Sequence, residues 1–144
     1  MKPLLLTCVL SFLGSFVSSG YEAIQSDNIC GIRLLERITN PSKINYSLVL
    51  KTTPEVKKIE REKISKESVR GKILLAEAEQ RITKLCTEIM KRDSYCSVWK
   101  NIKHSSKKID DITNKILNLL REDFDPTYYR KAIKTYKGCH NRPH

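Results

Sequence analysis

The residues that could do chemistry are few, and the densest group of them lies at the C-terminal end. Cys139, His140 and His144 offer one thiol and two imidazoles, all of which are metal ligands. We expect no metal there, because Cys139 is expected in a disulfide and the chain has no C-x-x-C pair. His104 stands among lysines and is predicted to be solvated rather than catalytic.

No catalytic motif accompanies these residues. The chain contains no G-x-S-x-G, P-loop, G-x-G-x-x-G or H-E-x-x-H sequence. The neighbouring carboxylates Asp110 with Asp111 and Glu77 with Glu79 fall on positions predicted to be exposed on helices, where they favour solubility. The sequence therefore predicts a protein that is not an enzyme and has no cofactor and no metal.

The first twenty residues have the pattern of a secretory signal peptide. A single lysine is followed by an apolar run over residues 4–13, and small residues then offer cleavage after Ser19 or Gly20. The run is too short to span a membrane, which needs about 20 apolar residues, and no later segment is apolar enough. We predict a signal peptide over 1–20 and a secreted, extracellular domain over 21–144 that does not span a membrane.

Removal of the signal would take Cys8 with it and leave four cysteines. In an oxidising compartment an even number predicts two disulfides. A bridge between Cys86 and Cys96 would close the turn between two helices, and one between Cys30 and Cys139 would join the ends of the domain. The pairing of Cys30 with Cys86 and of Cys96 with Cys139 stays open, because four cysteines allow three pairings.

Apolar residues recur at helical spacing along most of the mature chain. Asn40-Pro41 is expected to end one helix and Thr53-Pro54 to begin another, and Asp93 or Ser94 is expected to cap the longest. The predicted helices cover about 26–39, 54–70, 71–90, 95–122 and 126–137, with 43–53 as an extended crossover. This pattern predicts an all-α fold, a small disulfide-linked helical bundle of four to five helices with one long crossover loop.

Positive charge is concentrated in two stretches that lack acidic residues. The whole chain carries a net charge of +11, which falls to +10 because the signal holds one lysine and no acid. Outside the cell, the polyanions that fit such stretches are acidic receptor surfaces, heparan sulfate and anionic lipid, and not nucleic acid. The residues predicted to bind a polyanion or a protein partner are Lys100, Lys103, Lys107, Lys108, Arg130, Lys131, Lys134 and Lys137.

Three further features bear on surface function. Asn45-Tyr46-Ser47 is an acceptor sequence for N-linked glycosylation, so we predict a glycoprotein modified at Asn45. Trp99 could anchor a partner, but its spacing from Val98 and Ile102 favours core packing. The dibasic pair Lys91-Arg92 could mark prohormone processing, although cleavage there would divide the predicted helical hairpin.

These features are typical of a secreted non-enzymatic effector that binds an extracellular protein partner or receptor. Such an effector would be a cytokine-like signalling ligand or a venom- or saliva-type factor. A second possibility is a cationic heparin- or membrane-binding protein. A third is a helical carrier of small hydrophobic ligands, with a pocket lined by Leu74, Ile82, Ile112 and Ile116.

Overall fold

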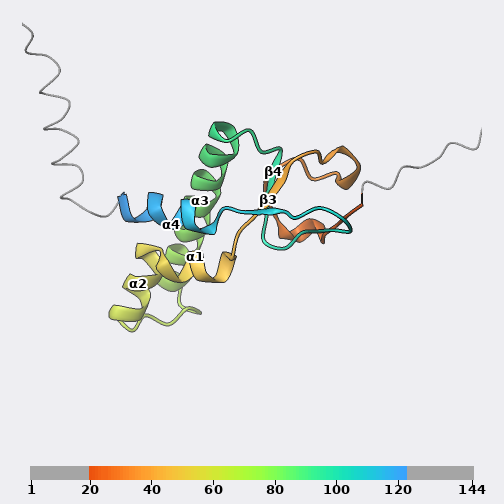
Figure 1. Cartoon of the computed structure of the whole chain (residues 1–144). Helices are drawn as coiled ribbons and strands as arrows, with labels where there is room; N and C mark the ends of the chain where they lie inside the picture. The colour runs from red at the N-terminus through yellow and green to blue at the C-terminus, as the bar shows by residue number, and fades with distance from the viewer. Residues whose placement is uncertain (1–19, 123–144) are drawn as a thin grey trace, which may run out of the picture.

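The computed structural model describes residues 20–122, which form a mixed α/β fold and not the predicted all-α bundle (Figure 1). The predicted cleavable segment before Gly20, the predicted helix 126–137 and Cys139 lie outside these residues. In chain order the elements are β1 (Tyr21–Glu22), β2 (Asn28–Gly31), β3 (Pro41–Lys43), α1 (Tyr46–Thr52), α2 (Pro54–Arg61), α3 (Val69–Arg92), β4 (Ser97–Trp99), β5 (Lys103–His104), β6 (Asp110–Asp111) and α4 (Thr113–Glu122).

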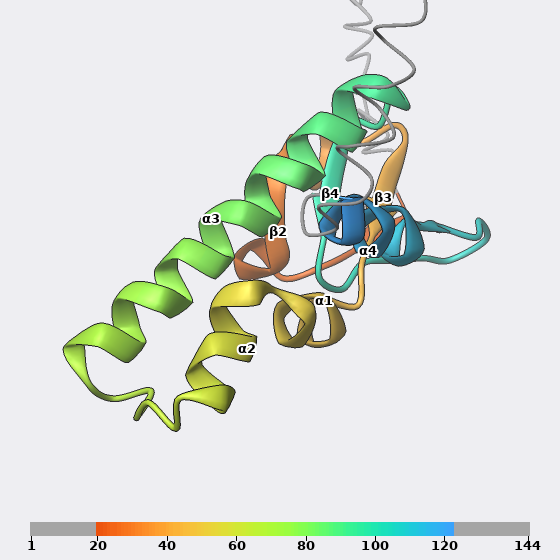
Figure 2. The same ribbon diagram turned by 90° about the vertical axis from the view of Figure 1, so that its left-hand side faces the viewer.

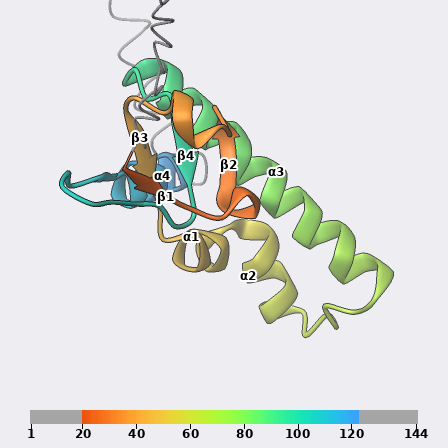
Figure 3. The same ribbon diagram turned by 90° about the vertical axis from the view of Figure 1, so that its right-hand side faces the viewer.

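A four-stranded sheet occupies the centre of the fold, with the strand order β2-β4-β3-β6. Strand β4 pairs antiparallel with β2 and parallel with β3, so segments more than 50 residues apart in the sequence lie side by side. Strands β1 and β5 form a separate two-stranded sheet. Figures 2 and 3 show the long helix α3 crossing beside β2 and β4, with α1 and α2 packed along the rest of its length.

The prediction of a helix over 95–122 is wrong for the residues before Thr113, which contain β4, β5 and β6. Adjacent residues Val98 and Trp99 are both fully buried, but they belong to two different core clusters. Successive side chains of a strand point to opposite faces, so β4 can supply both clusters at once. The apolar residues after it fall at helical spacing, yet only Thr113–Glu122 is helical.

The segments expected as a first helix and a crossover are also different. Residues 26–39 contain β2 between two short 3₁₀ helices, and residues 43–53 contain α1. A crossover at residue 43 would have no partner strand. The structure supplies two, since β3 pairs with both β4 and β6. Asn45 caps the N-terminus of α1, because its Oδ1 accepts a hydrogen bond from the Leu48 N–H at 3.1 Å.

Helix α3 confirms the apolar stripe predicted after Gly71. Its buried face repeats every three or four residues, from Leu74 to Ile89. The helix ends because Ser94 adopts a left-handed backbone with φ of 58°, and the Tyr95 N–H then bonds to the Met90 carbonyl at 3.0 Å. This reversal leads directly into β4, so Asp93 and Ser94 end α3 rather than cap a following helix.

The predicted start of α2 is confirmed. Thr53 caps the helix through its side chain, and Pro54 occupies the first turn. The helix ends at Arg61 and not near residue 70 as predicted, and its apolar residues Val56 and Ile59 are buried. Glu55 is also buried, and its Oε1 accepts two hydrogen bonds from the Arg81 guanidinium on α3.

The described cysteines Cys30, Cys86 and Cys96 are free thiols, so the predicted disulfides are wrong for these residues. Cys86 lies in the large core cluster, whereas Cys96 packs against the Trp99 cluster. The Cys96 Sγ accepts a hydrogen bond from the Asn40 N–H at 3.3 Å. The predicted bridge assumed a helical hairpin, and without a second helix after α3 the two thiols face different cores.

We expect the three described thiols to react at very different rates. Burial raises the pKa of Cys86 to about 12, and the Cys30 thiol adds to the rise. Burial also opposes ionisation of Cys96, but hydrogen bonds from Ser97, Asn40 and Thr39 outweigh it and lower its pKa. In reduced native protein at pH 8, iodoacetamide should therefore modify Cys96 first and Cys86 last, as measured by peptide mass.

Unfolding in urea should bring these alkylation rates together, because all three thiols then share the same solvent. A peptide joining Cys86 to Cys96, or equal rates in the native protein, would contradict the arrangement.

Candidate functional site

The most distinctive surface of the described chain is the segment 100–108, which we name the lysine loop. Figures 2 and 3 show it projecting away from the helices, between β4 and the start of α4. It contains no acidic residue, and its lysines Lys100, Lys103, Lys107 and Lys108 are all exposed. None of the four has an ion-pair partner within residues 20–122.

The loop is held in shape by His104. Its Nδ1 accepts hydrogen bonds from the backbone N–H groups of Ser106 and Lys107, each at 3.0 Å. The imidazole also packs edge-on against Tyr21, with ring centroids 4.5 Å apart, where β1 pairs with β5. His104 is half-buried rather than solvated, and its contacts assign it a structural role in displaying the lysines.

The base of the loop is fixed to the central sheet. The Lys100 N–H donates a 2.7 Å hydrogen bond to the Asp27 carbonyl, directly after the buried Trp99. The Lys100 Nζ lies over the ring of Tyr46, 4.3 Å from its centroid, in a cation–π contact. This contact leaves the ammonium group at the surface, where an anion can reach it.

A surface pocket of about 400 Å³ opens beside Lys100. Strand pairing places Lys43 opposite Asp111 at this pocket. Partial burial opposes ionisation of Asp111, but hydrogen bonds from Thr113 and the charge of Lys43 lower its pKa. The pocket is lined by Lys43, Ile44, Asn45, Tyr46, Ser47, Lys100, Asn101 and Asp111.

Sequence reasoning identified the lysines but not their setting. It placed Lys100, Lys103 and Lys107 in one helix, whereas in the structure Lys103 belongs to strand β5 and the other two lie in the bends on either side of that strand. It missed Lys43 and Asp111, because the parallel pairing of β3 with β6 has no local signal in the sequence. The second predicted basic group, Arg130, Lys131, Lys134 and Lys137, lies outside the described residues.

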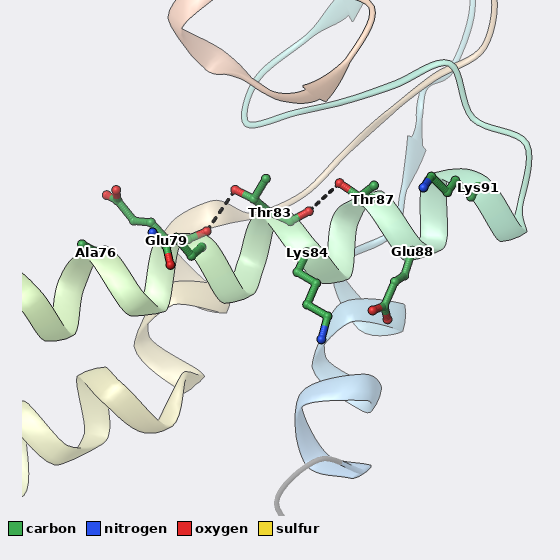
Figure 4. A pocket seen from close by; sticks show the side chains of 8 residues that line it. Ala76, Glu79, Thr83, Lys84, Thr87, Glu88 and Lys91 are labelled. Carbon is green, nitrogen blue, oxygen red and sulfur yellow. Dashed lines mark hydrogen bonds between the residues drawn. The ribbon is translucent and has the colours of Figure 1, made fainter.

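A larger open groove of about 710 Å³ follows one side of α3 (Figure 4). Its hydroxyl groups are already engaged, since Thr83 and Thr87 donate to the carbonyls of Glu79 and Thr83. The remaining polar side chains are lysines, glutamates and Gln80 on exposed positions of the same helix. This groove therefore offers no nucleophile paired with a base, and its mixed positive and negative charges do not favour a charged ligand.

The paired carboxylates do not form an acid–base site either. Asp110 and Asp111 follow each other in strand β6, not on a helix as predicted, so their side chains point to opposite faces. Asp110 accepts a hydrogen bond from the Tyr95 hydroxyl at 3.1 Å, and Asp111 accepts from Thr113. Within residues 20–122, no group of three or more His, Cys, Asp or Glu side chains is placed to hold a metal ion.

The remaining predicted roles of apolar residues can now be located. Trp99 is fully buried, which confirms core packing over partner anchoring. Of the residues expected to line the pocket of a carrier, Ile82, Ile112 and Ile116 are buried in one core cluster, and Leu74 is buried on α3. No helix between residues 20 and 122 is long and apolar enough to cross a membrane.

No protein family, curated protein sequence or solved structure matches this chain.

Proposed function

We propose that this chain is a secreted, non-enzymatic protein that binds sulfated glycans of the heparan sulfate class through its lysine loop. The observation that carries the proposal is the display of Lys100, Lys103, Lys107 and Lys108, all exposed and without ion-pair partners in the described chain, on a projecting loop. The secretory signal predicted for residues 1–20 would bring this loop to the compartment where such glycans occur.

The chemistry of the loop favours a linear polyanion over a protein at this surface. Protein interfaces depend on a few buried aromatic or arginine anchors. The lysine loop offers neither, because Trp99 is buried beneath it and Tyr46 is covered by the Lys100 ammonium. A sulfated glycan instead gains affinity from many weak charge contacts, which a projecting lysine-rich loop can supply.

The loop is also a poor membrane anchor. Peripheral binding to lipid is much stronger where exposed apolar side chains lie beside the basic ones. The two isoleucines that flank the lysines, Ile102 and Ile109, are buried in the Trp99 cluster. A sulfated glycan needs no such apolar contact.

The test is heparin binding by the full secreted chain and by a variant with Lys100, Lys103, Lys107 and Lys108 all changed to Gln. At low salt the variant should bind immobilised heparin at least about tenfold more weakly, because each lost contact contributes several tenths of a kcal/mol or more. The dependence of log Kd on log salt should become shallower by nearly one for each lysine that contacts the glycan.

A matched control removes the same charge elsewhere. The lysines Lys57, Lys66, Lys72 and Lys84 are exposed on or beside α2 and α3, and changing all four to Gln should alter heparin binding far less. If both variants lose the same affinity, net charge alone explains binding. If the loop variant binds like the unmodified chain, the proposal is wrong.

A protein-binding effector is the second candidate, and a different surface favours it. Strand β2 lies at an edge of the central sheet, where a partner strand could pair with it. The exposed aliphatic side chains of Ile24, Ile32 and Leu34 lie at either end of this strand. Partner binding that survives the loop variant but is lost on changing Ile32 and Leu34 to Asp would support this function.

A further inference from the structure

The predicted glycosylation site lies at the base of the lysine loop. Asn45 is exposed, and within the described chain its Nδ2 makes no hydrogen bond. Its Oδ1 is already used, because it caps α1 by accepting from the Leu48 N–H. A sugar attached to Nδ2 would therefore leave the cap of α1 intact.

The covalent step itself is simple. The Nδ2 amide attacks C1 of an oligosaccharide carried on a lipid diphosphate, so that an N–C bond forms and the C1–O bond to the diphosphate breaks. The lipid diphosphate leaves, and the amide nitrogen gives up one proton. The acceptor sequence Asn45-Tyr46-Ser47 meets the requirement for this transfer, and both Asn45 and Ser47 are exposed.

The three residues of the acceptor sequence line the same pocket as two lysines. Asn45, Tyr46 and Ser47 lie with Lys43 and Lys100 around the 400 Å³ pocket. Tyr46, the middle residue of the acceptor, carries the Lys100 ammonium over its ring at 4.3 Å. The first sugars on Asn45 would consequently lie at the pocket mouth, beside the lysine that begins the loop.

We propose that an N-linked glycan on Asn45 covers the base of the lysine loop and lowers its affinity for sulfated glycans. The inference rests on the function proposed above and adds its regulation. The attached glycan is bulky, so it excludes a polyanion from Lys43 and Lys100. Lys103, Lys107 and Lys108 line no part of this pocket, so glycosylation weakens binding without abolishing it.

Ser47 allows the glycan to be removed without disturbing Asn45. In Ser47→Ala the acceptor sequence is lost while the Asn45 side chain still caps α1. In Ser47→Thr the acceptor is retained, so this variant is the matched control for any change at position 47. The unmodified chain and both variants are secreted from the same eukaryotic cells, and the mass of each reports whether it carries a glycan.

Heparin is the probe, with Kd measured at one fixed low salt concentration. We expect Ser47→Ala to bind roughly threefold to tenfold more tightly than the unmodified chain, with Ser47→Thr matching the unmodified chain. Equal affinities for all three, or an unmodified chain whose mass shows no glycan, would overturn this inference. The proposed function is tested separately, by the four-lysine variant and its matched control, neither of which changes the acceptor sequence.

Discussion

Replacing Trp99 with Ala is expected to lower the free energy of unfolding by about 3–5 kcal/mol, the usual cost of truncating a fully buried large aromatic residue. Trp99 is the largest fully buried side chain in the described residues and packs with Ile38, Ile102 and Ile109. Its removal leaves a cavity in a small cluster that has few other residues to fill it. Urea denaturation followed by circular dichroism measures the change.

Trp99→Phe separates the two contributions of this side chain. Phenylalanine keeps most of the apolar contact but loses the 2.8 Å hydrogen bond from Nε1 to the Ser97 Oγ, so it should cost clearly less than alanine. An alanine variant within about 1 kcal/mol of the original chain would show that Trp99 is not packed in a core.

The same replacement should also affect the lysine loop. The Trp99 carbonyl accepts from the Ile44 N–H, and Lys100 follows directly, so this residue joins the sheet to the base of the loop. Trp99→Ala is therefore expected to weaken heparin binding even under conditions in which the protein is still folded.

Replacing Arg81 with Met is expected to destabilise the fold by about 2–3 kcal/mol, because it leaves the buried Glu55 carboxylate without its guanidinium. Two hydrogen bonds, at 2.9 and 2.7 Å, now join Arg81 to the Oε1 of Glu55. The Oε2 of the same carboxylate is buried and has no hydrogen-bond partner. The pair therefore links α2 to α3, and the Arg81 guanidinium offsets the free energy cost of burying the Glu55 carboxylate.

A double-mutant cycle tests this explanation. Glu55→Leu combined with Arg81→Met removes both charges and should be considerably more stable than Arg81→Met alone. Strictly additive effects of the two single changes would show that the two side chains do not interact. Chemical denaturation of the four proteins gives all the free energies required.

The local signals in the sequence were sufficient for the start of α2 and for most of α3, but not for the end of α2 at Arg61. Thr53-Pro54 marks the start of α2 by a side-chain cap and a fixed φ, which depend only on neighbouring residues. The stripe from Leu74 to Ile89 predicts α3 because a helix brings residues three and four apart onto one face. The excess of lysine over 100–108 was equally visible, since charge is a property of composition.

The spacing of apolar residues after residue 95 predicted correctly which side chains are buried, but it predicted the wrong secondary structure for them. Val98, Ile102, Ile109, Ile112 and Ile116 are all buried, as a helical seam would require. Burial of Val98, however, is achieved in a strand whose partners are Cys30 and Ser42. That strand is stabilised by pairing with β2 and β3, which lie too far away in the sequence for a local pattern to reveal them.

Residue types and their local spacing were enough to predict which side chains are apolar enough to be buried, where two helices begin, and where positive charge accumulates. Long-range packing was needed to place residues 97–99 inside a sheet, Cys86 and Cys96 against separate clusters, and Asn45 in one pocket with Lys100. Caps, helical periodicity and charge act between near neighbours, whereas strand pairing and pocket formation join residues 55 or more positions apart.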